Sequence, residues 1–278
     1  MAEYPRLSEE VIKAALKTVD AGPFGVSCHY FKQTGSTNDH ARALANAGAP
    51  EGTLVITDEQ IAGRGRYTRT WVAPRNTSLL MSLVFRPEIP PTEAHRLVMA
   101  CGLAIADACE RELSAPVEVK WPNDLLIVGR KFTGILPESA FSGDQLEWVV
   151  VGMGINVNQV FEPEDPLYGL ATSLREASGR VIDRAELLAD ILAGIRRWYA
   201  LLAANMLEET WRGRCSTLGQ SVRAEVEGSI IEGVALDITS NGALWIREAG
   251  GERHLITAGE ATIVKPGQEG QHPGHQHT

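Results

Sequence analysis

The pattern of apolar residues along this chain of 278 residues changes in character near residue 214. Before that position, short apolar segments typical of strands alternate with long segments of helical periodicity, such as residues 92–113 and 183–204. After it, short strand-like segments follow one another, and glycines separate them. The chain is therefore predicted to form an α+β unit over residues 1–213 and a small β unit over residues 214–266.

Each unit has its own expected elements. In the first, helices are expected over residues 9–19, 40–47, 92–113 and 183–204, and strands over residues 26–31, 53–57, 78–85, 117–120, 125–128, 131–136 and 146–151. In the second, strands are expected near residues 222–226, 230–238, 243–246, 254–256 and 261–264, with a turn at Asn241-Gly242. Such short strands are typical of a small barrel. Residues 211–219 look like the boundary, and the His-rich end, residues 267–278, is expected to be a disordered tail.

Charge and cysteine content narrow the classes of function. The formal net charge of −9 and the isoelectric point near 5.3 argue against a general nucleic-acid binder. The four cysteines have no close paired spacing, which predicts reduced thiols and no zinc site. No signal peptide is evident, and no apolar run is long enough to span a bilayer. A cytoplasmic protein without membrane contact is expected.

A segment rich in arginine and glycine, residues 60–71, lacks helical and strand periodicity and is expected to be a loop. Its glycines permit a sharp bend or close approach to a ligand, and its guanidinium groups suit carboxylate or phosphate oxygens. A solvated turn or part of a nucleic-acid patch would have the same composition. Within an acidic chain, the segment is predicted to bind a small anion. The residues concerned are Gly63, Gly65, Arg64, Arg66 and Arg69, with Trp71 closing the loop.

Other segments place polar side chains where a ligand can meet them. Ser36 or Thr37 precedes a helical segment, so its hydroxyl can either cap that helix or face a polar ligand. A hairpin turning at residues 129–130 makes Asp124 and Lys131 neighbours. The Gly-Met-Gly-Ile-Asn segment at 152–156 is expected to follow a strand, and it is only a weak sign of a nucleotide site.

Five motifs occur in the order and spacing of one known family. They are Gly-Ser-Thr-Asn at 35–38, Gly-Arg-Gly-Arg at 63–66, Lys-Trp-Pro-Asn-Asp-Leu at 120–125, Arg-Lys-Phe-Thr-Gly-Ile-Leu at 130–136 and Gly-Met-Gly-Ile-Asn at 152–156. Together they resemble the biotin protein ligases, or biotin–[acetyl-CoA-carboxylase] ligases. The resemblance implies a mixed β-sheet flanked by helices, related to class II aminoacyl-tRNA synthetases, followed by a C-terminal SH3-like barrel. Residues 1–213 would then be the biotin- and ATP-binding catalytic domain.

The resemblance also implies a reaction in two steps. The carboxylate of biotin attacks the α-phosphate of ATP, which gives biotinyl-5′-AMP and pyrophosphate. The ε-amine of a lysine on a biotin carboxyl carrier protein, or on the carrier domain of acetyl-CoA carboxylase, then attacks the anhydride. Mg²⁺ is expected to accompany ATP, and a resident metal is not expected.

The resemblance assigns roles to individual side chains. Lys131, Arg64 and Arg66 are expected to neutralise the two anions that meet in the first step. Asp124 is expected to orient or deprotonate the incoming lysine, and the loop to be mobile until ligand binds. The expected biotin contacts are Ser36, Thr37, Asn38, Gln60, Arg64, Gly65, Arg66, Lys131 and Gly134, and the expected nucleotide contacts are Gly63, Arg66, Trp71, Asn123 and Asn156.

Two departures from the family pattern and two rival functions complete the prediction. Tyr67-Thr68 replaces the usual Arg-Gly, and Pro137 lies within a strand, which affects loop behaviour and local pairing. The first motif begins at Gly35, so no helix-turn-helix domain and no operator binding are expected; homodimers are common in the family. A non-catalytic biotin- or carrier-binding module would lack the phosphate-handling charges. A lipoate-type ligase would share the fold and chemistry, but the arginine loop and residues 120–124 favour biotin.

Overall fold

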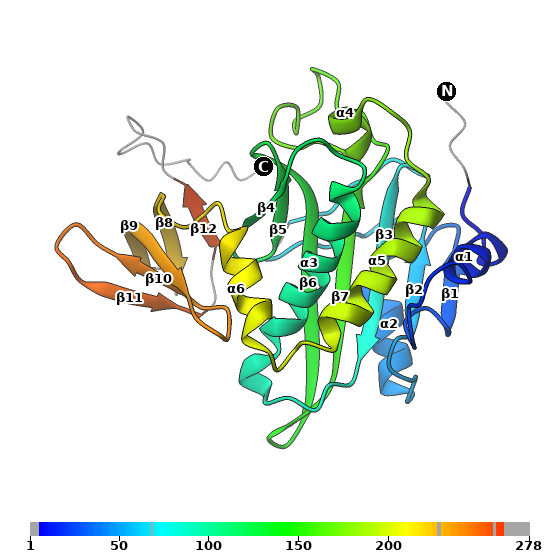
Figure 1. Ribbon diagram of the computed structural model, residues 1–278, viewed down its shortest axis with the longest axis horizontal. Coiled ribbons are helices and arrows are strands. Elements are labelled where there is room, and N and C mark those ends of the chain that lie inside the picture. Colours follow the sequence, from blue (N-terminus) through cyan, green and yellow to red (C-terminus); the bar gives the residue numbers. More distant parts are fainter. Residues whose placement is uncertain (1–5, 68, 227–228, 258–259, 264–278) are drawn as a thin grey trace.

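The computed structural model describes residues 6–67, 69–226, 229–257 and 260–263, which form two β-sheets and their helices (Figure 1). The larger sheet has seven strands in the order β1-β2-β3-β7-β6-β5-β4, and β1 and β2 pair in parallel whereas the other neighbours pair antiparallel. The predicted mixed sheet is therefore confirmed. Its strands are β1 (Cys28–Phe31), β2 (Leu54–Thr57), β3 (Ser78–Phe85), β4 (Val117–Lys120), β5 (Asp124–Ile127), β6 (Arg130–Ser142) and β7 (Gln145–Asn156).

Helices cover both faces of this sheet. On one face, α3 and α5 lie side by side across the strands, with α6 beside them (Figure 1). On the other face, α2 buries Ala41 and Ala45 against Val84 and Val150 of β3 and β7. The sheet is thus the middle layer of the predicted α+β architecture. The helices are α1 (Glu9–Leu16), α2 (Thr37–Asn46), the short 3₁₀ turn Pro91–Glu93, α3 (His95–Glu110), α4 (Leu174–Ser178), α5 (Arg184–Tyr199) and α6 (Asn205–Gly213).

Alternate residues of strand β7 face the hydrophobic core on one side of the sheet and the cavity on the other. Alternate residues of a strand point to opposite faces, and Val149, Val151 and Met153 enter the core under α3 and α5. Trp148 and Val150 pack toward α2 instead. Continuing the alternation places Gly152 and Gly154 on the α2 face, where they leave the sheet surface bare. That bare surface is the floor of the cavity described below.

The smaller sheet follows α6 and contains five antiparallel strands in the order β11-β10-β9-β8-β12. It lies beside the β4 end of the larger sheet (Figure 1). The indole Nε1 of Trp121 donates to the carbonyl of Gly242 at 2.8 Å, and the backbone N–H of Trp121 donates to Thr217 Oγ1 at 3.0 Å. These bonds tie the segment before Asp124 to the small sheet. Its strands are β8 (Ser221–Val226), β9 (Ser229–Ile238), β10 (Leu244–Arg247), β11 (Arg253–Ile256) and β12 (Glu260–Ile263).

Two expected strand ends were wrong. Strand β7 continues past residue 151 through residues 152–156, and β6 continues past residue 136 through Pro137 to Ser142. Trp211, where the expected boundary begins, lies in α6 and is fully buried beside Gly102 of α3. The predicted division at residues 213 and 214 stays a prediction, and the predicted tail, residues 267–278, lies outside the described residues.

All four cysteines are free. Within the part of the chain that the structure describes, no helix has the length and apolar character needed to cross a membrane.

Candidate active site

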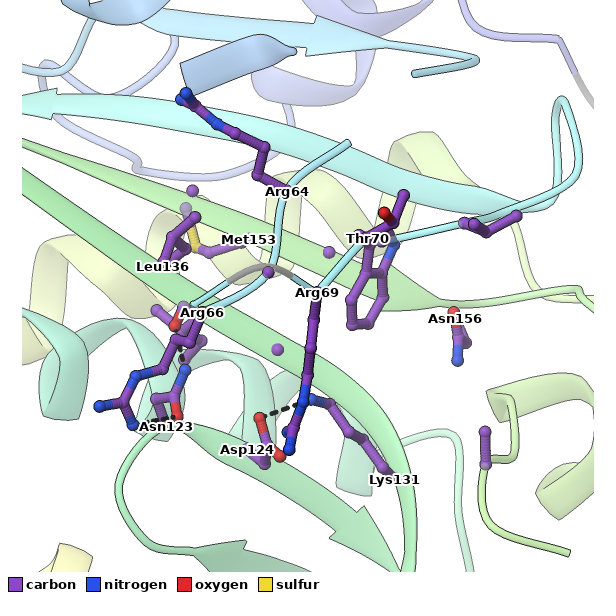
Figure 2. A pocket seen from close by; sticks show the side chains of 18 of the residues that line it. Arg64, Arg66, Arg69, Thr70, Asn123, Asp124, Lys131, Leu136, Met153 and Asn156 are labelled. Atoms are coloured by element: carbon purple, nitrogen blue, oxygen red, sulfur yellow. Dashed lines mark hydrogen bonds and ion pairs between the residues drawn. The ribbon is translucent and has the colours of Figure 1, made fainter. Parts of the chain in front are cut away.

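A cavity of about 680 Å³ opens on the α2 face of the larger sheet, under the arginine-rich loop (Figure 2). Its size suits a small-molecule ligand. Every residue predicted to contact biotin lines it, as do all the predicted nucleotide contacts except Gly63. Gly63 instead forms the base of the loop, where its carbonyl accepts the Trp71 N–H at 3.0 Å and a Cβ would lie 2.4 Å from the Trp71 carbonyl oxygen.

The first turn of α2 presents Ser36 and Thr37 to the cavity. Ser36 is the N-cap residue, with extended backbone, but its side chain makes no capping hydrogen bond. The N–H of Thr37 is satisfied by Gln60 Oε1 at 2.8 Å instead, and the Thr37 hydroxyl lies 3.1 Å from the same oxygen. Capping therefore does not explain the Ser36 hydroxyl, and the residue lines the cavity.

Asn38, next in the helix, is held firmly from behind. Its Oδ1 accepts from Ser82 Oγ at 2.6 Å, and its Nδ2 donates to Glu138 Oε1 at 2.8 Å and to the Leu136 carbonyl at 3.3 Å. A Cβ on Gly152 would lie 2.2 Å from Asn38 Oδ1. The glycine is thus required for Asn38 to approach the sheet this closely.

Trp71 lies on a floor made of two glycines. Gly134 of β6 and Gly154 of β7 are paired across the strands, and a Cβ on them would come within 2.9 Å and 2.5 Å of the indole. The ammonium of Lys131 is 5.6 Å from the centre of the same ring, within the range of a cation–π contact. The glycines of the 152–156 motif therefore act through close approach of side chains, not as a phosphate-binding turn.

The β5–β6 hairpin brings Asp124 and Lys131 together as predicted. Lys131 Nζ lies 2.7 Å from Asp124 Oδ1, and the lysine side chain is 38% exposed whereas the carboxylate is 17% exposed. The ammonium is thus accessible from the cavity while its partner is largely covered. The pair can separate when an anion competes for the lysine.

The loop arginines point in different directions (Figure 2). Arg66 reaches Asn123, with Nη1 3.4 Å from Asn123 Oδ1, and Arg69 extends toward Asp124 and Lys131. Arg64 turns away and donates to Asp39 and Glu138 at 2.8 Å and 2.9 Å. Thus Arg69 and Lys131 are directed to Asp124, Arg66 is directed to Asn123, and all three side chains line the cavity.

At the far end of the cavity, Asn156 offers an unused acceptor. Its side chain is 5% exposed, and its Nδ2 donates to the Thr172 carbonyl at 3.2 Å. Its Oδ1 has no hydrogen-bond partner among the described residues. A buried acceptor of this kind suits an amine donor on a ligand.

His95, at the start of α3, lies behind the arginine loop in a second cavity of about 130 Å³ shared with Arg66, Trp121 and Gly242. Burial and the positive charge of Arg66 lower the pKa of His95 to about 4. The imidazole is therefore neutral at physiological pH. A Cβ on Gly242 would lie 1.9 Å from the His95 ring, so this turn of the small sheet packs directly onto α3.

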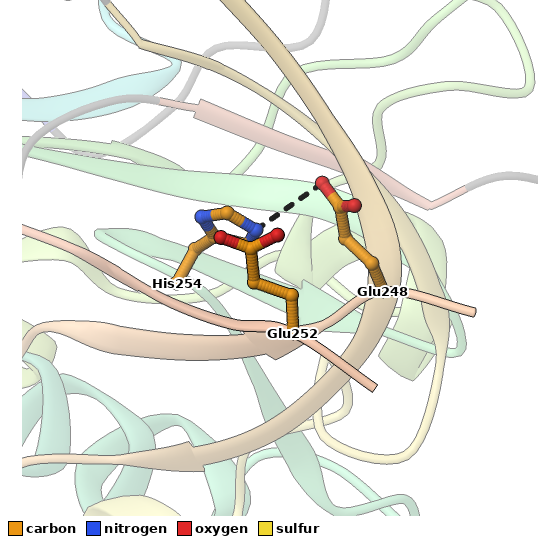
Figure 3. A group of neighbouring side chains, drawn as sticks. All are labelled: Glu248, Glu252 and His254. Carbon is orange, nitrogen blue, oxygen red and sulfur yellow. Dashed lines mark ion pairs between the residues drawn. The ribbon is translucent and has the colours of Figure 1, made fainter. Parts of the chain in front are cut away.

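Among the described residues, the one group of three side chains with metal-ligand spacing lies elsewhere. Glu248, Glu252 and His254 gather on the small sheet, with His254 Nε2 3.2 Å from Glu248 Oε1 (Figure 3). The group is partly exposed and does not line the cavity. Within the cavity, Asp124 is the only carboxylate among the described lining residues.

Sequence comparisons identify the class to which this fold and site belong. The profile of the Biotin/lipoate A/B protein ligase family matches residues 30–156, and that of the Biotin protein ligase C terminal domain matches residues 217–263. The first profile spans ligases of two related acids, so it defines a protein ligase of the biotin and lipoate class.

Individual relatives narrow the class. The chain is 36% identical over 257 residues to the bifunctional ligase/repressor BirA of Bacillus spizizenii, covering 91% of this chain and 78% of that protein. It is 35% identical over 271 residues to the biotin–[acetyl-CoA-carboxylase] ligase of Mycobacterium tuberculosis, covering 94% and 97%. The structure of the Aquifex aeolicus biotin protein ligase with biotin and ATP matches with a TM-score of 0.70 and 28% identity, covering 86% and 99%. This chain belongs to the biotin protein ligase family.

Sequence reasoning missed three polar residues that organise the site. Ser82 holds Asn38 from the floor, and Asp39 and Glu138 hold Arg64. Ser82 had a detectable signal, since it is a polar residue within the otherwise apolar strand of residues 79–85. Glu138 had none, because its partners come from two segments remote in sequence.

Proposed function

We propose that this chain activates biotin with ATP and transfers it to a lysine of a biotin carboxyl carrier protein, such as the carrier domain of acetyl-CoA carboxylase. The observation that carries the proposal is that Lys131, Arg66 and Arg69 line the same cavity that presents neutral polar groups at the start of α2. A ligand with a polar neutral ring at one end and an anion at the other fits a cavity that has neutral polar groups in one part and cations in another. Family membership supports the same function.

The first step joins two anions and therefore needs concentrated positive charge. A carboxylate oxygen of biotin attacks the α-phosphorus of ATP, and the bond to pyrophosphate breaks. Lys131 holds the carboxylate and α-phosphate together, and Arg66 covers the phosphates as charge builds up. Asp124 forms an ion pair with Lys131; the arriving anions take over the ammonium and leave Asp124 free.

The second step needs a neutral amine. Once Lys131 has released it, Asp124 can orient the lysine of the carrier protein. Its carboxylate then takes up the proton of the carrier's ammonium group. The amine nitrogen attacks the acyl carbon, an amide forms and AMP leaves. The loop, anchored at Gly63 and Trp71, keeps water from the anhydride meanwhile.

Biotin and the adenine of ATP bind at opposite ends of the cavity. The ureido ring of biotin takes the Ser36, Thr37, Asn38 and Gln60 end, because a buried polar ring needs paired donors and acceptors. Adenine takes the other end, where Trp71 offers an apolar face and Asn156 Oδ1 a free acceptor. Asn123, bonded to Arg66, supports the loop between them.

Mg²⁺ enters as part of the MgATP substrate. Among the described residues that line the cavity, Asp124 is the single carboxylate, which suits a cation that would arrive with the nucleotide better than one held in a protein cage. When bound, the ion neutralises charge on the triphosphate.

The test is biotin-dependent exchange of labelled pyrophosphate into ATP, followed by transfer of labelled biotin to a carrier domain. Exchange and transfer that require biotin support the proposal. Lipoate supplied in parallel should give neither. Exchange with lipoate alone, or biotin binding without exchange, would overturn it.

A further inference from the structure

Arg64 lines the cavity, and its guanidinium group belongs to a closed network of charges at the edge of the cavity. Its Nη2 contacts Asp39 Oδ1 at 2.8 Å and Glu138 Oε1 at 2.9 Å. Arg42 contacts the same two carboxylates, at 3.0 Å and 3.1 Å. These two arginines and two carboxylates, called here the four-charge network, balance one another without net charge.

The four-charge network joins three separate parts of the site. Asp39 and Arg42 lie on α2, Glu138 lies on β6, and Arg64 lies in the arginine-rich loop. A single pair of exposed charges contributes little to stability, whereas several charges in one network contribute more. Holding Arg64 on α2 and β6 therefore fixes the loop in the position from which Arg66 and Arg69 line the cavity.

Besides Arg64 and Arg42, Glu138 has a partner outside the four-charge network, the side chain of Asn38. The same Oε1 atom that accepts from Arg64 also accepts from Asn38 Nδ2 at 2.8 Å. Asn38 lines the cavity, whereas Glu138 does not. At 22%, the Glu138 side chain is also the least exposed of the four. Because Glu138 bonds both Asn38 and Arg64, a ligand that contacts Asn38 acts on the same carboxylate that holds the loop.

We propose that Glu138 is a positioning residue that couples occupation of the biotin pocket to the position of the arginine-rich loop. It acts through Asn38 on one side and Arg64 on the other. The inference rests on the proposed function, because it takes biotin as the ligand that meets Asn38. It gives a role to the contacts of the Arg64 guanidinium group with Asp39 and Glu138, which hold the loop that covers the cavity.

Limited proteolysis tests this coupling, because trypsin cleaves after the arginines of the loop. The measured quantity is the rate of cleavage within residues 63–71 without biotin divided by the rate with saturating biotin. In the unaltered chain this ratio should exceed one clearly. Glu138→Gln keeps an oxygen for Asn38 but loses the charge that holds Arg64. In this variant the ratio of cleavage rates should fall by about fivefold, and it should reach one if the unaltered ratio is smaller than that. Glu138→Ala should behave likewise.

Asp39→Asn is the matched control. It removes the other partner of Arg64 but leaves the contact between Glu138 and Asn38, so cleavage should be faster with and without biotin while the ratio is retained. A folded Glu138→Gln that keeps the unaltered ratio would overturn the inference, as would an Asp39→Asn that loses it equally.

Biotin binding, measured by calorimetry on each variant, separates the two proposals. An unaltered chain that binds biotin without protection of the loop refutes the coupling and leaves the function standing. An unaltered chain that binds no biotin refutes both.

Discussion

Gly154 lies beneath the indole of Trp71, and Gly152 lies beside Asn38, so two glycines of one strand support opposite ends of the cavity. Gly154→Ala would place a Cβ 2.5 Å from Trp71 Cε2, whereas carbon atoms pack best at about 3.5–4.0 Å. The indole must therefore move by about 1 Å. Overpacking of this size costs about 1–3 kcal/mol, which corresponds to about a 5- to 150-fold effect.

The loss of affinity in Gly154→Ala should concern ATP and not biotin. If Trp71 borders the nucleotide, Gly154→Ala raises the KM for ATP in pyrophosphate exchange by that factor and leaves the calorimetric Kd for biotin within about twofold. Gly152→Ala, whose Cβ would lie 2.2 Å from Asn38 Oδ1, should weaken biotin instead. Gly213→Ala, with no atom within 4 Å of its Cβ, should change neither. Equal losses for both substrates in Gly154→Ala would refute the assignment of the two ends.

Three further outcomes follow. Arg66→Gly should release biotinyl-5′-AMP faster, by about 10- to 100-fold, and unchanged leakage in a rapid dilution assay would count against the loop's role. Burial and Arg66 hold the pKa of His95 near 4, below its unfolded value, so its contribution to stability is complete above about pH 6.5 and is lost as the pH falls toward 4. In His95→Gln the denaturation midpoint should therefore depend less on pH between about 4 and 6.5. An unaltered dependence of the midpoint on pH would contradict this. Asp58→Asn should cost about 3–5 kcal/mol in denaturant unfolding, because Arg184, 1% exposed, loses its buried partner at 3.0 Å; a loss near zero would show that the pair is replaceable.

Much of the fold could be predicted because local patterns agreed with the final structure. The apolar run at residues 78–85 became the fully buried interior strand β3 with the expected bounds, and Asp183 capped α5 where the helix was expected to begin. The hairpin prediction also placed Asp124 beside Lys131, since a tight turn fixes which residues face each other.

The errors arose where tertiary contacts override local preference. Glycines at 152 and 154 disfavour a strand locally, yet β7 runs through them because Asn38 and Trp71 need the space. The segment of α6 does carry a helical pattern, because Leu207 and Trp211 are buried one turn apart, but the segment is short and largely polar and was overlooked. The direction of Arg64 depends on α2 and β6 meeting in space, which spacing along the chain does not reveal.

The central claim is that Lys131 and the loop cations overcome the repulsion between biotin's carboxylate and the α-phosphate. Its most direct test is the single-turnover rate of pyrophosphate release with biotin and ATP both saturating, compared between the unaltered chain and Lys131→Met. The account predicts a fall of about 100- to 1,000-fold in that rate, with the calorimetric Kd for biotin changed far less. A Lys131→Met variant that releases pyrophosphate at the unaltered rate would contradict the account.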